Sequence, residues 1–220
     1  MSRFLSVVAA MAVCASFSGC GLLNFGGGGG YKPKECFNNA YAGDLGDAKV
    51  GRSVTYAMEA AGSKTLMTTK IVGQDGGAWW IESWMENPNM NLGYLYKVGS
   101  DKKVSEAYVA NKDDKEWTKI DVKEPPKMDA PAGGQKPTIK ESNEKKDVKA
   151  GGFDCKRLDV TVNVQGKDYT STTWYSKDVW KIAMPSEHGG AVAMEASGSK
   201  TSLEAKAEDA KPTIELPAKK

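Results

Sequence analysis

A strict alternation of apolar and polar residues is the feature that most limits what this chain can fold into. Residues 158–164 read Leu-Asp-Val-Thr-Val-Asn-Val, and Val54, Tyr56 and Met58 alternate with small or polar neighbours. A period of two places successive side chains on opposite faces of a strand, with one face buried. Turn-forming Gly, Asn and Asp residues recur roughly every 8 to 15 residues. The pattern predicts an all-β, mainly antiparallel fold with few or short helices.

The same pattern predicts where the strands lie within a single domain spanning 36–207. A Pro- and Gly-rich stretch at 123–136 is expected to be a loop or insertion, and the nearly all-charged Glu141–Lys149 could form one short helical turn. The end of the chain, 208–220, is rich in Ala, Lys, Glu and Pro, which predicts a disordered tail. We expect strands near 51–59, 64–73, 78–86, 92–98, 104–110, 116–122, 137–141, 154–164, 168–176, 180–184, 190–196 and 200–206.

The first 19 residues have the pattern of an export signal. Arg3 provides a positive charge, and the apolar run from Phe4 to Phe17 is too short to span a membrane. Phe17-Ser18-Gly19-Cys20 resembles the lipobox of bacterial lipoproteins, with Phe17 where Leu is usual. The resemblance implies cleavage before Cys20 and acylation of Cys20 with fatty acids such as palmitate. A conventional cleaved signal with a chance cysteine is the alternative.

The residues after Cys20 are suited to a flexible tether. Five consecutive glycines occur within 21–31, and such a run is costly to order, so 20–35 is predicted to be the lipidated cysteine plus a Gly-rich tether. Attachment through two or three acyl chains is stable where a single chain is marginal. The resemblance also implies an outer-membrane location, because Gly21 rather than Asp follows the cysteine. The membrane is therefore one expected partner.

The four cysteines are predicted to have different roles that depend on their positions in the chain. Of four, Cys14 would leave with the signal and Cys20 would carry lipid. The remaining pair, Cys36 and Cys155, is predicted to form a disulfide in an oxidising compartment, with two buried free thiols as the alternative. No metal site is predicted, since there is no C-x-x-C spacing and only one histidine, His188.

The composition argues against several functions. Thirty basic and 28 acidic residues give a net charge of +2, which does not indicate nucleic-acid binding. There is no G-x-S-x-G motif, and two Gly-Ser-Lys-Thr tetrapeptides, at 62–65 and 198–201, lack the rest of a phosphate loop and are expected to be hairpin turns. No enzyme activity and no cofactor are predicted. A cell-envelope hydrolase, tested through His188, Glu82 and Asp178, is the third alternative.

Tryptophans supply the candidate ligand-binding residues. All six lie in the β region, and in 78–86 two of them share one face with Glu82. They could be core residues, or they could line an apolar groove for an acyl chain. On the second interpretation Trp80 and Trp84 lie on the face of Glu82, and Trp79, Ile81 and Met85 lie on the other. The full set of groove candidates is Trp79, Trp80, Ile81, Trp84, Met85, Trp174 and Trp180.

Four stretches, 50–56, 148–158, 169–179 and 190–195, resemble domains of bacterial envelope proteins of uncharacterised function. Among them are an A-G-x-F-x-C pattern ending at Cys155 and a T-W-x-S-x-D-V pattern, followed by Trp180 where Pro is usual. These domains look like relatives of the lipoprotein-localisation (LolA/LolB-like) half-barrels. The resemblance implies a curved half-barrel sheet and a hydrophobic ligand, without the carrier activity. We therefore expect a non-enzymatic envelope lipoprotein that binds an amphiphile or an envelope protein; a structural or surface-interaction lipoprotein is the alternative.

Overall fold

The computed structural model describes residues 32–126, 136–164 and 166–217, and these form one large sheet. The predicted signal at 1–19, residues 20–31 of the predicted tether at 20–35, Cys20 included, and most of the 123–136 stretch lie outside the described residues. Within the described ranges, no helix is long and apolar enough to cross a membrane. The elements are β1 (Glu35–Phe37), η2 (Leu45–Asp47), β2 (Ser53–Ala60), β3 (Ser63–Asp75), β4 (Ala78–Asn87), β5 (Met90–Val98), β6 (Val104–Asn111), β7 (Thr118–Lys123), β8 (Thr138–Val148), β9 (Gly151–Val164), β10 (Lys167–Ser176), β11 (Pro185–Ser186), β12 (Gly189–Ala196) and β13 (Ser199–Ala207).

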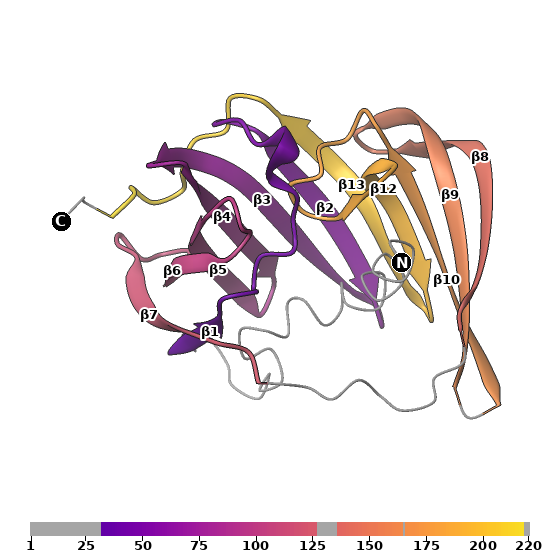
Figure 1. Ribbon diagram of the computed structural model, residues 1–220, viewed down its shortest axis with the longest axis horizontal. Coiled ribbons are helices and arrows are strands. Elements are labelled where there is room, and N and C mark those ends of the chain that lie inside the picture. The colour runs from indigo at the N-terminus through magenta and orange to yellow at the C-terminus, as the bar shows by residue number, and fades with distance from the viewer. Residues whose placement is uncertain (1–31, 127–135, 165, 218–220) are drawn as a thin grey trace.

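The strand order is β1-β7-β6-β5-β4-β3-β2-β13-β12-β10-β9-β8, with short β11 paired to β12. Every neighbouring pair is antiparallel except β1 and β7. The chain therefore runs from β2 outward to β7, crosses to the far edge at β8, and returns to pair β13 with β2. Figure 1 shows the sheet curving between these edges without closing. The predicted all-β, mainly antiparallel curved sheet is confirmed.

The main apolar cluster draws buried residues from most of the sheet, including β2 to β6, β9, β10, β12 and β13, and we call the face that it covers the core face. Val54, Tyr56, Ile71 and Ile81 are at most 1 % exposed there. The loop 177–188 packs into the same cluster and is held through its backbone. Tyr41 Oη donates to the Ile182 carbonyl at 2.9 Å, and Tyr56 Oη donates to the Ala191 carbonyl at 2.8 Å. Burial raises the pKa of both phenols.

Two predicted elements differ from the structure. No strand forms at 180–184, because these residues belong to the loop that inserts Ile182 and Met184 into the core. The charged stretch 141–149, expected to make a helical turn, lies mostly in strand β8, which pairs with β9 along its whole length. Most residues of this edge strand are exposed on both faces, so apolar alternation is not needed there and gave no signal.

The repeated Gly-Ser-Lys-Thr segments are hairpin turns, as predicted. Ala61 and Gly62 between β2 and β3 have φ of 49° and 76°, and Ser197 and Gly198 between β12 and β13 have 40° and 82°. Positive φ at both central residues is characteristic of two-residue hairpins that match the strand twist. The hairpins lie side by side, because β2 pairs with β13.

The predicted disulfide between Cys36 and Cys155 is wrong, because the structure forms no bond between these two cysteines. Cys36 lies in β1 and Cys155 in β9, near opposite ends of the strand order. Both side chains are buried, at 2 % and 5 % exposure. The disulfide is predicted from the number of cysteines and the oxidising compartment. The separation of Cys36 and Cys155 depends on the strand order, which neither of these reveals.

Candidate functional site

Strand β4 is apolar on both faces, and the structure separates those faces as the alternation predicts. Ile81 and Met85 are buried in the main cluster on the core face, with Trp79 packed against it. Trp80 and Trp84 belong to two smaller clusters that the opposite side chains of the sheet form. We call that second surface the strap face, because the C-terminal segment crosses it.

The segment 208–217, here called the strap, covers these two tryptophans. Its end is drawn in yellow at the left of Figure 1. Ile214 is only 6 % exposed and packs in the cluster of Trp84, while Leu216 packs in the cluster of Trp80. The predicted disordered tail is therefore wrong for 208–217. Two aliphatic residues separated by one position face the same side of an extended segment, and their burial holds the strap on the sheet.

A fully buried carboxylate fixes the strap. Glu82 in β4 has no exposed surface, and its carboxylate accepts hydrogen bonds from Lys70 Nζ at 2.9 Å and Trp84 Nε1 at 2.6 Å. The strap residue Thr213 donates its backbone N–H to Glu82 at 2.9 and 3.2 Å and its hydroxyl at 2.5 Å. Lys70 Nζ also donates to Thr213 Oγ1 at 2.7 Å. Such a network compensates the desolvation of the buried charge.

Aromatic rings form the walls beside this carboxylate. Trp84 and Trp117 have ring centroids 5.8 Å apart at 44°, and Trp80 and Tyr108 are 6.0 Å apart at 54°. Trp84 fits because Gly93 lies opposite it in β5: a Cβ on Gly93 would stand 2.6 Å from the indole. Burial, with a hydrogen bond to Glu106, raises the pKa of Tyr108 to about 12.

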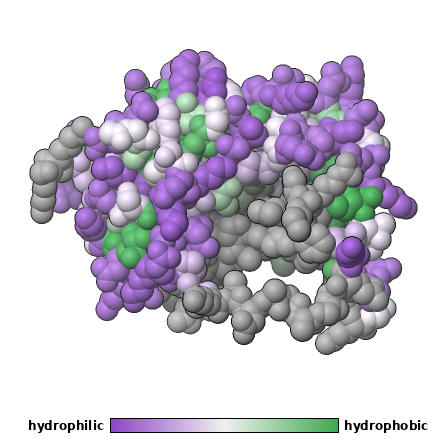
Figure 2. Space-filling view, viewed as in Figure 1, coloured by the Kyte–Doolittle hydropathy of each residue, from purple (hydrophilic) through white to green (hydrophobic). Residues whose placement is uncertain are grey.

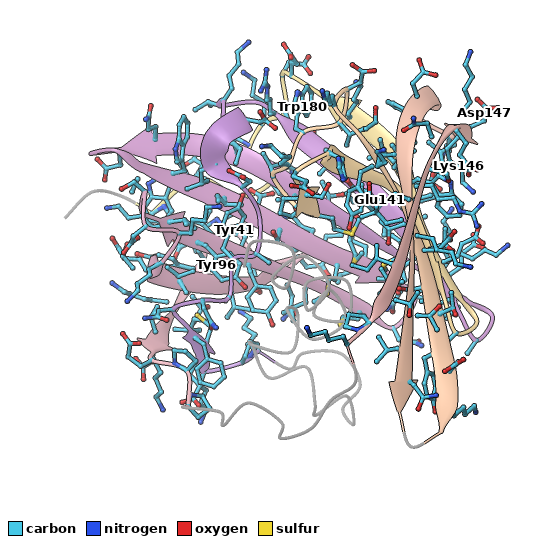
Figure 3. The ribbon with its side chains drawn as sticks, turned by 45° about the vertical axis from the view of Figure 1, so that its right-hand side comes forward. Tyr41, Tyr96, Glu141, Lys146, Asp147 and Trp180 are labelled. Atoms are coloured by element: carbon cyan, nitrogen blue, oxygen red, sulfur yellow. The ribbon has the colours of Figure 1, made fainter. Side chains whose placement is uncertain are left out.

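Trp174 lies under charged side chains of the neighbouring strands. Lys146 Nζ is 3.6 Å from the ring centroid, and the Arg157 guanidinium carbon is 5.5 Å from it. The indole N–H donates to Glu144, and this bond, with Arg157 next, lowers the pKa of that carboxyl group. Figure 3 labels Lys146 and Asp147 near one end of β8. At 4 % exposure, Trp174 is covered by the chain itself.

Trp180 is in the loop after β10 rather than in a strand. Two cations flank it: the Arg52 guanidinium carbon is 4.9 Å and Lys206 Nζ is 5.8 Å from its ring centroid. Cation–π contacts of this kind stabilise the loop against β2 and β13. Five of the seven groove candidates, Trp79, Ile81, Met85, Trp174 and Trp180, thus belong to the main cluster or pack against it. Trp80 and Trp84 lie on the opposite face of the sheet, so the seven do not line one groove.

The residues considered for catalysis also lie apart. His188 precedes β12, where its backbone N–H donates to Ser186 Oγ at 3.0 Å and its ring lies 3.6 Å from Glu187. The carbonyl oxygen of Asp178 accepts from Lys206 Nζ at 2.7 Å, and Glu82 is bound by the strap. Among the residues that the structure describes, no group of three or more His, Cys, Asp or Glu could hold a metal ion.

Sequence reasoning missed the strap and its partners. It singled out Glu82 but not Lys70 or Thr213, because those contacts join positions 131 and 143 residues apart. One local signal was present: Thr213-Ile214-Glu215-Leu216 alternates polar and aliphatic residues within an otherwise charged and Pro-containing end. The same alternation that predicted the strands would have predicted an extended, half-buried segment here.

Comparisons with known proteins add two distant structural similarities. No protein-family description and no curated protein matches the sequence. A "putative exported protein with YmcC-like fold" from Bacteroides fragilis is 11 % identical, with 72 % of this chain and 96 % of that chain covered and a TM-score of 0.35. A "putative lipoprotein" from Parabacteroides distasonis is 14 % identical, with 72 % and 95 % covered and a TM-score of 0.33. At these scores the likeness carries no argument about ligand or mechanism.

Proposed function

We propose that this protein is a non-enzymatic, lipid-anchored protein of the bacterial cell envelope that acts by binding an envelope protein partner. The lipobox-like Phe17-Ser18-Gly19-Cys20 and the glycine run behind it support an anchor followed by a tether. Gly21 after the cysteine supports an outer-membrane location. The β domain is then held near the membrane surface, where it can meet a partner.

One observation favours a protein partner over a small apolar ligand. The indoles proposed to line an acyl groove are covered by groups of the same chain: the strap covers Trp80 and Trp84, and charged side chains flank Trp174 and Trp180. An apolar ligand would have to displace these groups. Figure 2 shows a mainly hydrophilic face with small, separate hydrophobic patches, which suits a polar protein interface.

An amphiphile is the second candidate ligand, because Trp79, Ile81 and Met85 share the core face of the curved sheet. Trp79 is only partly buried, so its emission would report a bound acyl chain. Titration of the mature protein with a fatty acid should then shift tryptophan emission, and Trp79→Phe should remove most of the shift. Lack of any shift would exclude this candidate.

Native mass spectrometry of the mature protein, extracted from membranes in mild detergent, tests the proposal. We expect a complex with a second protein and no stoichiometric acyl ligand beyond the covalent lipid. A stoichiometric lipid without a protein partner would support the second candidate instead. If the protein is cross-linked in cells before extraction and still appears only as a monomer without ligand, both the protein partner and the amphiphile are contradicted. His188→Ala should leave the complex unchanged.

A further inference from the structure

We propose that the groove beneath the strap is a recognition site for an extended peptide, and that its occupant in trans is the strap of a second copy of this chain. This inference goes beyond the proposed function and does not depend on it. The groove is a built surface with a polar anchor and two apolar subsites. The anchor is Glu82 with Lys70, and the subsites are lined by Trp80, Trp84, Ala110 and Trp117.

The polar anchor selects a hydroxyl residue and its backbone. Glu82, buried and held by Lys70, accepts both the N–H and the hydroxyl of Thr213. Two side chains also bind strap carbonyls: Lys70 Nζ donates to Lys211 O at 3.3 Å, and Trp117 Nε1, just before β7, donates to Ile214 O at 3.4 Å. The strap is thus bound as a peptide ligand is bound, through side chains of the sheet that reach its backbone.

The apolar subsites select the residues that follow. Ile214 fills the space between Trp84, Ala110 and Trp117, and Leu216 packs with the cluster of Trp80. The two anchors are separated by one residue, Glu215, which is exposed. The groove therefore fits an extended segment of four residues. The first carries a hydroxyl group, the second and fourth are aliphatic, and the third can be any residue.

The occupant of the groove in trans is a second copy of this chain, because every copy carries the strap that fits the groove. The strap connects to β13 through the exposed residues Glu208, Asp209, Lys211 and Pro212, and its Ala210 N–H donates to the Gly51 carbonyl, just before β2, at 2.9 Å. It can therefore lift without unpairing a strand of the sheet, so its opening belongs to the low-stability end of the molecule. Exchange with another copy re-forms the same contacts, which makes domain swapping a low-cost route to a dimer.

The test compares the intact mature chain with the variant Ile214→Asp/Leu216→Asp, both in detergent. The probe is a fluorescent peptide of residues Glu208–Lys220. The variant should bind the peptide at least about tenfold more tightly than the intact chain, because the intact strap competes at high effective concentration. A peptide with Thr213→Val should bind the variant about tenfold more weakly, since it lacks the hydroxyl that Glu82 accepts.

Exchange is then measured by native mass spectrometry of mixed chains. Tagged and untagged intact chains should form a mixed dimer, in which each strap occupies the groove of the other copy. The double-aspartate variant should stay monomeric, and excess free peptide should dissociate the dimer. Peptide binding without such a complex would show a purely intramolecular strap and overturn the proposal, as would equal peptide binding to both chains. If the double variant fails to fold by circular dichroism, Leu216→Ala replaces it. These readouts need neither membrane nor envelope partner, so they fail separately from the proposed function.

Discussion

Glu82 shows how one residue can link distant parts of this fold. A carboxylate without exposed surface would be strongly destabilising in isolation, yet it accepts bonds from an ammonium, an indole, a hydroxyl and a backbone amide. The donors come from β3, from β4 itself and from the strap. Removal of any one donor leaves part of the buried charge uncompensated, and removal of the cation should matter most.

Lys70→Met should therefore lower the free energy of unfolding by about 3 kcal/mol or more, because the buried carboxylate of Glu82 would lose its countercharge. Urea denaturation followed by circular dichroism measures the change. Lys97→Met is the matched control: Lys97 pairs with Asp75 and Glu106 near the surface, where a pair contributes about 1 kcal/mol or less. Equal losses in the two variants would contradict the role given to Glu82.

Cys155 provides a pH-dependent prediction. Burial, with the nearby charge of Glu144 next, raises the pKa of its thiol from 9.0 to about 11. The folded state therefore holds this proton more tightly than the unfolded state. The free energy of unfolding should fall as pH rises from about 9 to about 11, because the unfolded thiol ionises first.

Two measurements check this prediction. Iodoacetamide at pH 8 should modify Cys155 slowly in the native protein and rapidly in urea, as followed by peptide mass spectrometry. Cys155→Ser should show a smaller loss of stability above pH 9 than the parent chain. Rapid native alkylation would mean that the thiol is neither buried nor protonated as described.

At the scale of elements, the alternation of residues predicted the strands that have one buried face and failed elsewhere. The hairpins at 61–62 and 197–198 followed from local turn chemistry, which needs no tertiary contact. Strand β8 and the strap could not be recognised in this way. β8 forms because its backbone pairs with β9, and the strap is ordered because the groove on the strap face binds it. That Trp174 and Trp180 join the cluster of Ile81 and Met85 likewise depends on how the strands are ordered in the sheet.

The charges of β8 should protect an open edge of the sheet. Its outer edge has no strand beyond it in the described sheet, and unpaired edges invite association with other chains. Lys145→Val combined with Asp147→Val, both at exposed positions, should increase self-association at high protein concentration. Light scattering measures the effect. Lys112→Val combined with Asp113→Val, in the exposed turn after β6, is the control and should scatter as the parent does.

At the scale of the whole molecule, the predicted localisation signal and the β domain are separate parts of the sequence. Cys20 and the glycine run precede the described domain in the sequence. Attachment to the membrane should therefore depend on one thiol, while folding depends on the sheet. The partner proposed above would meet a domain that the glycine run joins to the predicted anchor.

Cys20→Ser should move the protein from the membrane fraction to the soluble envelope fraction, because acyl chains supply the membrane affinity. Fractionation with immunoblotting measures this change, and mass spectrometry of the N-terminal peptide should show the loss of the acyl groups. Cys36→Ser, at a buried position of β1, is the control and should remain membrane-bound if it folds. Retention of Cys20→Ser in the membrane would contradict the lipoprotein assignment.

The sequence by itself determined the fold class, most strands and their hairpins, since alternation and turn residues act over a few positions. It also carried the lipobox-like motif, whose meaning is chemical and local. Only the tertiary structure decided that Cys36 and Cys155 lie toward opposite ends of the sheet and that charged β8 is a strand. It also decided that Glu82 and Thr213 meet across 131 residues. These outcomes depend on strand order and on contacts between distant segments, and no local pattern encodes which distant segment will bury a given side chain.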